Sequence, residues 1–96
     1  MHFLVIAYDD VDPAALERRL AVREAHLAGI IELKEKGNFI EGGAILGDGG
    51  KMIGSTLYME FPSREELERW LRNDPYTTGG VWFNVKVENI RLAFRP

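Results

Sequence analysis

The sequence has no cysteine, only two histidines and only four prolines among its 96 residues. The absence of cysteine excludes disulfide bonds, thiolate metal sites and a cysteine nucleophile, and it suits a reducing compartment. No stretch approaches the roughly 20 apolar residues that a membrane-spanning helix needs. The first apolar run, residues 3–7, has no basic leader and is followed at once by two aspartates, unlike an export signal. We therefore expect a cytoplasmic protein with no membrane contact.

Length and charge further narrow the classes of protein to which this chain can belong. Domains usually contain roughly 100–150 residues, so we expect residues 1–96 to form a single domain. The hydrophobic content of 46% and the charged content of 28% are typical of a globular protein. The formal net charge of -3 argues against a general affinity for nucleic acid or for anionic membranes.

Caps, stop signals and periodicity predict the order β-α-β-β-α-β. Asp12-Pro13 is expected to start the first helix, and Gly37 to end it. Ser63 and Glu66 form a capping box that predicts the start of a second, shorter helix. The expected segments are strand 1–8, helix 12–36, strands 38–46 and 52–60 joined by a glycine-rich turn, helix 63–72, an irregular stretch 73–80 and strand 81–94. This order predicts an α+β, ferredoxin-like sandwich.

The first strand is apolar on both of its faces. Phe3 and Val5 alternate with Leu4 and Ile6, yet two helices can cover only one face of a four-stranded sheet. The other face would expose an apolar patch larger than monomers normally tolerate. We therefore predict a homodimer in which two copies pack sheet against sheet. The alternative is partial cover of this face by loops and by the chain's own tail.

Three basic side chains project into the apolar arc of the first helix. At about 100° per residue, this arc is defined by Leu16, Leu20, Leu27 and Ile31 and is extended by Val22, Ile30 and Leu33. Arg19, Arg23 and His26 fall within the arc, on one ridge of the helix. In one interpretation the arginines reach solvent or pair with carboxylates across the sheet, and His26 is a hydrogen-bonded core residue. In the other, the ridge lines a polar cleft that receives an anionic or phenolic ligand.

A second informative segment follows the second helix. Pro75 disfavours helical geometry at Asp74, so the helix should end there with the carboxylate at its mouth. Ordinary turn chemistry explains the same residues, because Asn and Asp before Pro are common turn initiators. The hydroxyl groups of Tyr76, Thr77 and Thr78 are candidate hydrogen-bonding groups in either case.

The order of these features resembles the YciI-like (YCII-related) family over essentially the whole chain. The resemblance rests on the amino-terminal strand, on Arg23-x-x-His26, on Asp74-Pro75-Tyr76 and on the Gly-Val-Trp-x-x-Val run at 80–85. It implies a dimeric α+β barrel of ferredoxin-like subunits, related in fold to muconolactone isomerase. It also implies an active site built on a histidine–aspartate dyad, which here would be His26 and Asp74. One branch of the family eliminates chloride from a chlorinated hydroxyhydroquinone, whereas most members have no assigned substrate.

A histidine beside a carboxylate suits proton transfer near neutral pH. The ordinary histidine pKa is about 6.5, and a carboxylate on one ring nitrogen fixes the tautomer and stabilises the imidazolium. We predict a small enzyme of the lyase or isomerase type in which His26 and Asp74 are catalytic. Its substrate would be small and anionic or phenolic. Arg23, Arg19 and Tyr76 are the predicted substrate-binding residues, with the arginines steadying a developing oxyanion.

Other chemistries are less well supported. Ser55 and Ser63 are assigned to a strand and to a helix cap, which argues against a serine nucleophile. The two histidines share no metal-ligand spacing, so we expect neither a metal nor another cofactor. Two alternatives to an enzyme remain open: a ligand-binding or accessory module with the same cleft and no turnover, and a purely structural dimerisation domain.

Overall fold

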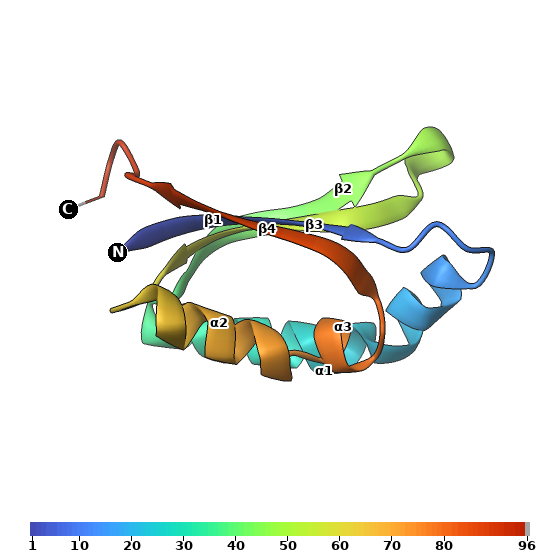
Figure 1. Ribbon diagram of the computed structural model, residues 1–96, viewed down its shortest axis with the longest axis horizontal. Helices are drawn as coiled ribbons and strands as arrows, with labels where there is room; N and C mark the ends of the chain where they lie inside the picture. The colour runs from blue at the N-terminus through green and yellow to red at the C-terminus, as the bar shows by residue number, and fades with distance from the viewer. Residues whose placement is uncertain (96) are drawn as a thin grey trace.

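Four antiparallel strands form one sheet in the computed structural model, which describes residues 1–95. The strands are β1 (His2–Asp9), β2 (Phe39–Leu46), β3 (Met52–Glu60) and β4 (Trp82–Ile90), in the order β2-β3-β1-β4. The helices are α1 (Ala15–Lys36), α2 (Arg64–Asn73) and the one-turn α3 (Pro75–Thr78), and the 3-10 turn η1 (Asp48–Gly50) joins β2 to β3. All three α-helices lie against the same face of the sheet, which leaves the opposite face without a helix (Figure 1). The predicted α+β, ferredoxin-like βαββαβ architecture is confirmed.

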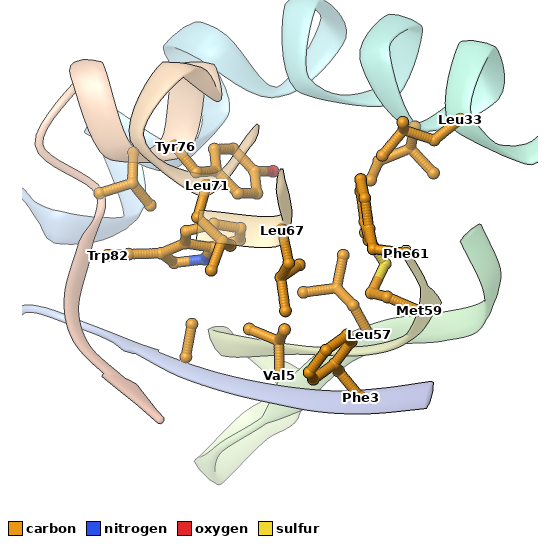
Figure 2. Close-up of a cluster of buried hydrophobic side chains, with 13 residues drawn as sticks. Phe3, Val5, Leu33, Leu57, Met59, Phe61, Leu67, Leu71, Tyr76 and Trp82 are labelled. Carbon is orange, nitrogen blue, oxygen red and sulfur yellow. The ribbon is translucent and has the colours of Figure 1, made fainter. Parts of the chain in front are cut away.

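The core lies between the sheet and the helices. On central strand β1, Val5 is paired in register with Leu57 of β3 and with Val87 of β4, so their side chains share one face. Leu67 of α2 points onto this face, toward Val5 and Leu57 (Figure 2). Val5 and Leu67 are fully buried. Packing of α2 on this layer fixes where the chain enters α3.

The buried face of α1 differs from the predicted one. The arc was centred on Leu20, yet Leu20 is 53% exposed and Ile31 is 59% exposed. The residues of α1 that are buried are Ala15, Arg19, His26, Ile30 and Leu33. The helix is thus rotated away from Leu20 and Ile31, whereas Arg19 and His26 face inward as the wheel predicted. A helical wheel assigns the inward face by hydrophobicity alone, and it cannot include carboxylates on other elements that make buried cations tolerable.

Helix α1 begins at Ala15, three residues later than predicted. Asp12 does not cap this helix, because its carboxylate accepts a hydrogen bond from the backbone N–H of Ala14 in the preceding turn. The same carboxylate binds the Arg18 guanidinium, with an Nη1 to Oδ2 distance of 2.9 Å. Gly37 ends the helix as predicted, in the left-handed conformation with φ of 84°.

Two further segments of the structure differ from the prediction. Strand β4 ends at Ile90 and does not extend to Phe94. The stretch 73–80, predicted to be irregular, contains the helical turn α3, because Asp74 caps it and Pro75 occupies its first position. The predicted cap of α2 is present, with the Ser63 hydroxyl accepting from the Glu66 backbone N–H at 3.2 Å.

Candidate active site

His26 and Asp74 meet at the junction of α1 and α3. The His26 Nδ1 atom lies 2.7 Å from Asp74 Oδ2, and the two side chains are only 7% and 1% exposed. An ionised carboxylate can only accept hydrogen bonds, so Nδ1 is the donor. In the neutral imidazole this leaves Nε2 unprotonated. Nε2 has no hydrogen-bond partner among residues 1–95.

Local backbone geometry holds Asp74 in this place. Asp74 has φ and ψ of -67° and 142°, the extended geometry that a residue before proline prefers. As the N-cap of α3 it also accepts the Tyr76 backbone N–H, at 3.0 Å from Oδ2. The oxygen that binds His26 is therefore fixed by a second, backbone hydrogen bond.

Aromatic rings hold the imidazole from two sides. The Tyr76 ring stacks on His26 with centroids 3.8 Å apart and planes inclined by 11°. Trp82 meets His26 edge-on, with centroids 5.7 Å apart. Figure 2 shows Tyr76 and Trp82 beside one another at one end of the core. These contacts fix the plane of the imidazole, which orients Nε2.

A buried ion pair lies about two helical turns before His26 on α1. The Arg19 Nη1 atom lies 3.0 and 3.1 Å from the two carboxylate oxygens of Asp9, at the end of β1. Burial raises the pKa of Asp9, and the adjacent Arg19 charge opposes this rise. The Arg19 guanidinium also lies over the Tyr76 ring, 4.7 Å from its centroid. Arg19 thereby links β1 to the aromatic layer beside His26.

A cavity of about 130 Å³ opens beside these groups, between α1 and the β2–β3 hairpin. The polar residues that line it are Arg19, Arg23, His26, Ser55, Thr56 and Tyr76. Its apolar lining includes Leu27, Ile30, Phe39 and Leu57. Burial raises the pKa of the Tyr76 hydroxyl above its ordinary value of 10.0, against the opposing charges of Arg19 and Arg23. Tyr76 is therefore a neutral hydrogen-bond donor at physiological pH.

The structure brings together all five residues predicted for the site, in different environments. His26, Asp74, Tyr76 and Arg19 are buried, and Arg19 is already paired with a carboxylate. Arg23 is exposed beside the cavity, with no hydrogen bond or ion pair among residues 1–95. Arg19 thus pairs with a carboxylate of the sheet, as in the first interpretation, and Arg23 lines a cavity, while a ligand for that cavity stays a prediction.

Two polar residues of the site were not predicted. Asp9 follows Phe3, Val5 and Ala7 at alternate positions of β1, so the period of two places its carboxylate on the core face. Ser55 precedes Leu57 at the same spacing on β3. A polar residue in phase with buried apolar residues was the available signal.

Within residues 1–95 no group of three histidine, aspartate or glutamate side chains is arranged to hold a metal ion. In the same part of the chain, no helix has the length and apolar character needed to cross a bilayer.

Comparison with known proteins gives a consistent set of relatives. The model of the YCII-related domain family matches residues 1–91. Protein YciI of Escherichia coli is 35% identical over 98% of this chain and 100% of its own length. An uncharacterized protein of Haemophilus influenzae is 32% identical over the same shares of the two chains.

One solved structure is similar in both fold and sequence. It is the 5-chloro-2-hydroxyhydroquinone dehydrochlorinase TftG of Burkholderia phenoliruptrix, in complex with 2,5-dihydroxybenzoquinone. It superposes with a TM-score of 0.85 at 34% identity, covering 95% of this chain and 94% of its own.

Proposed function

This chain belongs to the YCII-related domain family, and on that basis we propose that it is a small enzyme of the lyase or isomerase type that needs no cofactor. The family includes at least one small-molecule enzyme, the dehydrochlorinase TftG. The observation that carries the proposal is the 2.7 Å contact between His26 and Asp74 at the edge of a cavity. A buried base with one nitrogen fixed and the other free has the arrangement needed for proton transfer.

In the proposed reaction, Nε2 of His26 takes a proton from the substrate. Asp74 keeps Nδ1 protonated and stabilises the imidazolium that forms. In an elimination, the electron pair left by the proton forms a new double bond, and the leaving group departs with the electrons of its own bond. In an isomerisation, the imidazolium returns the proton to a different atom of the substrate. Neither route requires a nucleophile from the protein.

The size and charge of the cavity support a small, oxygenated ring as substrate. The volume of about 130 Å³ is close to the roughly 150 Å³ of an engineered cavity that binds benzene. The exposed cation of Arg23 and the neutral hydroxyl of Tyr76 favour an anionic or phenolic group. The 2,5-dihydroxybenzoquinone bound by TftG belongs to this class.

We further propose that the protein is a homodimer joined through the helix-free face of the sheet. Leu4, Ile6 and Tyr58 are only half-buried on this face, and Tyr8 beside them is 46% exposed. No helix covers them in Figure 1. A second copy would bury this apolar centre.

The enzymatic proposal is tested by measuring chloride release from 5-chloro-2-hydroxyhydroquinone and proton loss from related single-ring phenols and lactones. His26→Gln should lower kcat/KM by about 100-fold or more, the usual contribution of a general base. His2→Gln is the matched control, because His2 pairs with Glu60 away from the cavity. Equal turnover by His26→Gln and the native protein would overturn the assignment. Binding of these compounds with no product from any of them would favour a ligand-binding module.

A further inference from the structure

Ser55 is held by two donors at the inner face of β3. The Arg19 Nη2 atom donates to its hydroxyl oxygen at 2.9 Å, and the Trp82 indole N–H donates to the same oxygen at 3.2 Å. Ser55 is buried and lines the cavity beside His26. These contacts join the Arg19–Asp9 ion pair to the aromatic layer.

The two contacts decide the direction of the Ser55 hydroxyl proton. A hydroxyl oxygen has two lone pairs and one proton. Guanidinium and indole groups have no acceptor, so both lone pairs of Ser55 are engaged and its proton must point elsewhere. No acceptor among residues 1–95 receives that proton. Because Ser55 lines the cavity, the cavity is the space where an acceptor can meet it.

A second donor in the same network also lacks a hydrogen-bond partner in the described residues 1–95. The Arg19 Nε–H is buried and has no hydrogen-bond partner in the part of the chain described. Arg19 lines the cavity as well, and its side chain is 4% exposed. Buried polar groups in proteins are almost always hydrogen-bonded, so an unpaired buried donor indicates an acceptor supplied from outside the chain.

We propose that Ser55, backed by Arg19, forms a donor subsite that binds an anionic or carbonyl oxygen of the ring substrate. This inference rests on the proposed function and adds a substrate requirement to it. The substrate must carry an oxygen acceptor on the side facing Ser55 as well as an acidic proton facing His26. When His26 takes the proton from a phenol or enol that is conjugated with that oxygen, negative charge would develop on the oxygen, and the subsite would stabilise the oxyanion.

The test is the dissociation constant of 2,5-dihydroxybenzoquinone, measured by calorimetry. Ser55→Ala should raise Kd by about tenfold or more, as expected for loss of a hydrogen bond to a charged acceptor. Ser55→Thr keeps the hydroxyl and should restore Kd to within about threefold of the native value. Ser55→Ala also leaves the Trp82 indole N–H without an acceptor, which can destabilise the fold. The same comparison is therefore repeated in a Trp82→Phe background, where that indole donor is absent.

Each outcome decides the proposal. Equal Kd values for Trp82→Phe and the Trp82→Phe/Ser55→Ala double variant would overturn it. A Thr variant as weak as the Ala variant would overturn it too, because the hydroxyl that Thr retains would then make no difference to binding. Failure of the native protein to bind the probe at millimolar concentration would contradict both the subsite and the proposed substrate class. Weak binding by Ser55→Ala with no turnover in any assay would support the subsite and contradict the enzyme. Loss of turnover in His26→Gln with unchanged Kd in Ser55→Ala would support the enzyme and contradict the subsite.

Discussion

At the scale of single residues, the site is built from two buried contacts, each between a basic side chain on one face of α1 and a carboxylate. Arg19 meets Asp9 from β1, and His26 meets Asp74 from the start of α3. Each charged or polar group is acceptable in the interior only because its partner comes from another element. Removing one partner leaves the other buried and unpaired, so these contacts couple the stability of the fold to the geometry of the site.

The ion pair beside the cavity gives a stability prediction. Asp9→Ala should lower the free energy of unfolding by about 3–5 kcal/mol, because Arg19 would remain buried without its carboxylate. Asp10→Ala is the matched control, since the neighbouring carboxylate only caps the exposed N–H of Val11, and its effect should stay within about 1 kcal/mol. Urea unfolding measures both values. Similar losses in the two variants would show that the Arg19 pair has no special role.

A second residue-scale prediction concerns acid stability. The hydrogen bonds from Arg18 lower the pKa of Asp12 to about 2, from the ordinary value of 3.8. The contribution of Asp12 to stability is therefore fully present above pH 3.8 and is lost as the pH falls toward 2, because the unfolded state binds the proton first. Asp12→Asn should flatten the decrease in unfolding free energy over this range. Asp9, whose raised pKa acts in the opposite direction, is present in both proteins and cancels in the comparison. An identical pH profile for the two proteins would contradict this account.

At the scale of elements, the short helix α3 carries half of the site, because it holds Asp74 and Tyr76 against α1. A β-carbon on Gly79, the residue that ends α3, would lie 2.7 Å from the Pro75 carbonyl oxygen and 3.2 Å from Val22. Gly79→Ala should therefore displace α3, cost about 1–3 kcal/mol of stability and weaken binding in the cavity.

Gly29→Ala, in the middle of α1, is the control for Gly79→Ala. A β-carbon on Gly29 would have no atom within 4 Å, so Gly29→Ala should stabilise the protein by about 0.5–1 kcal/mol through helix propensity. Thermal unfolding and the Kd of 2,5-dihydroxybenzoquinone distinguish the two. Normal binding by a destabilised Gly79→Ala variant would show that the position of α3 does not control the site.

Elements were more predictable from the sequence than the packing of their faces. Gly37 and the Ser63 cap act locally, through backbone geometry, and both were correctly assigned. The predicted inward face of α1 included Arg19 and His26 correctly but was centred wrongly on Leu20, because the true centre depends on Asp9 and Asp74, which lie on other elements. The contact of His26 with Asp74 was expected from a family resemblance, since neither helix periodicity nor turn chemistry could supply it. Ser55 was assigned only to a strand, because its two donors come from α1 and β4.

At the scale of the whole molecule, the sheet has one face packed by helices and one face without them (Figure 1). The helix-free face has an apolar centre on β1 and β3, bordered by a Lys86–Glu88 ion pair on β4. An apolar centre with a polar border is the arrangement found in protein interfaces.

The proposed dimer is tested by light scattering coupled to gel filtration. The native protein should have twice the mass of one chain. Ile6→Lys should shift it toward the monomer, because a charge would be buried at the centre of the proposed interface. Leu20→Lys places the same change on the exposed side of α1 and should leave the mass unchanged. A monomeric native protein, or a dimer insensitive to Ile6→Lys, would contradict the proposed interface.

The proposed mechanism requires that Asp74 leaves Nε2 of His26 unprotonated and open to the cavity. Long-range proton–nitrogen NMR of the ring, recorded where the imidazole is neutral, tests this claim most directly. We expect a protonated Nδ1 and a bare Nε2, with the Nε2 resonance shifting on addition of 2,5-dihydroxybenzoquinone and the tautomer preference weakening in Asp74→Asn. A ring protonated at Nε2, or an Nε2 resonance that ignores the bound quinone, would contradict the account.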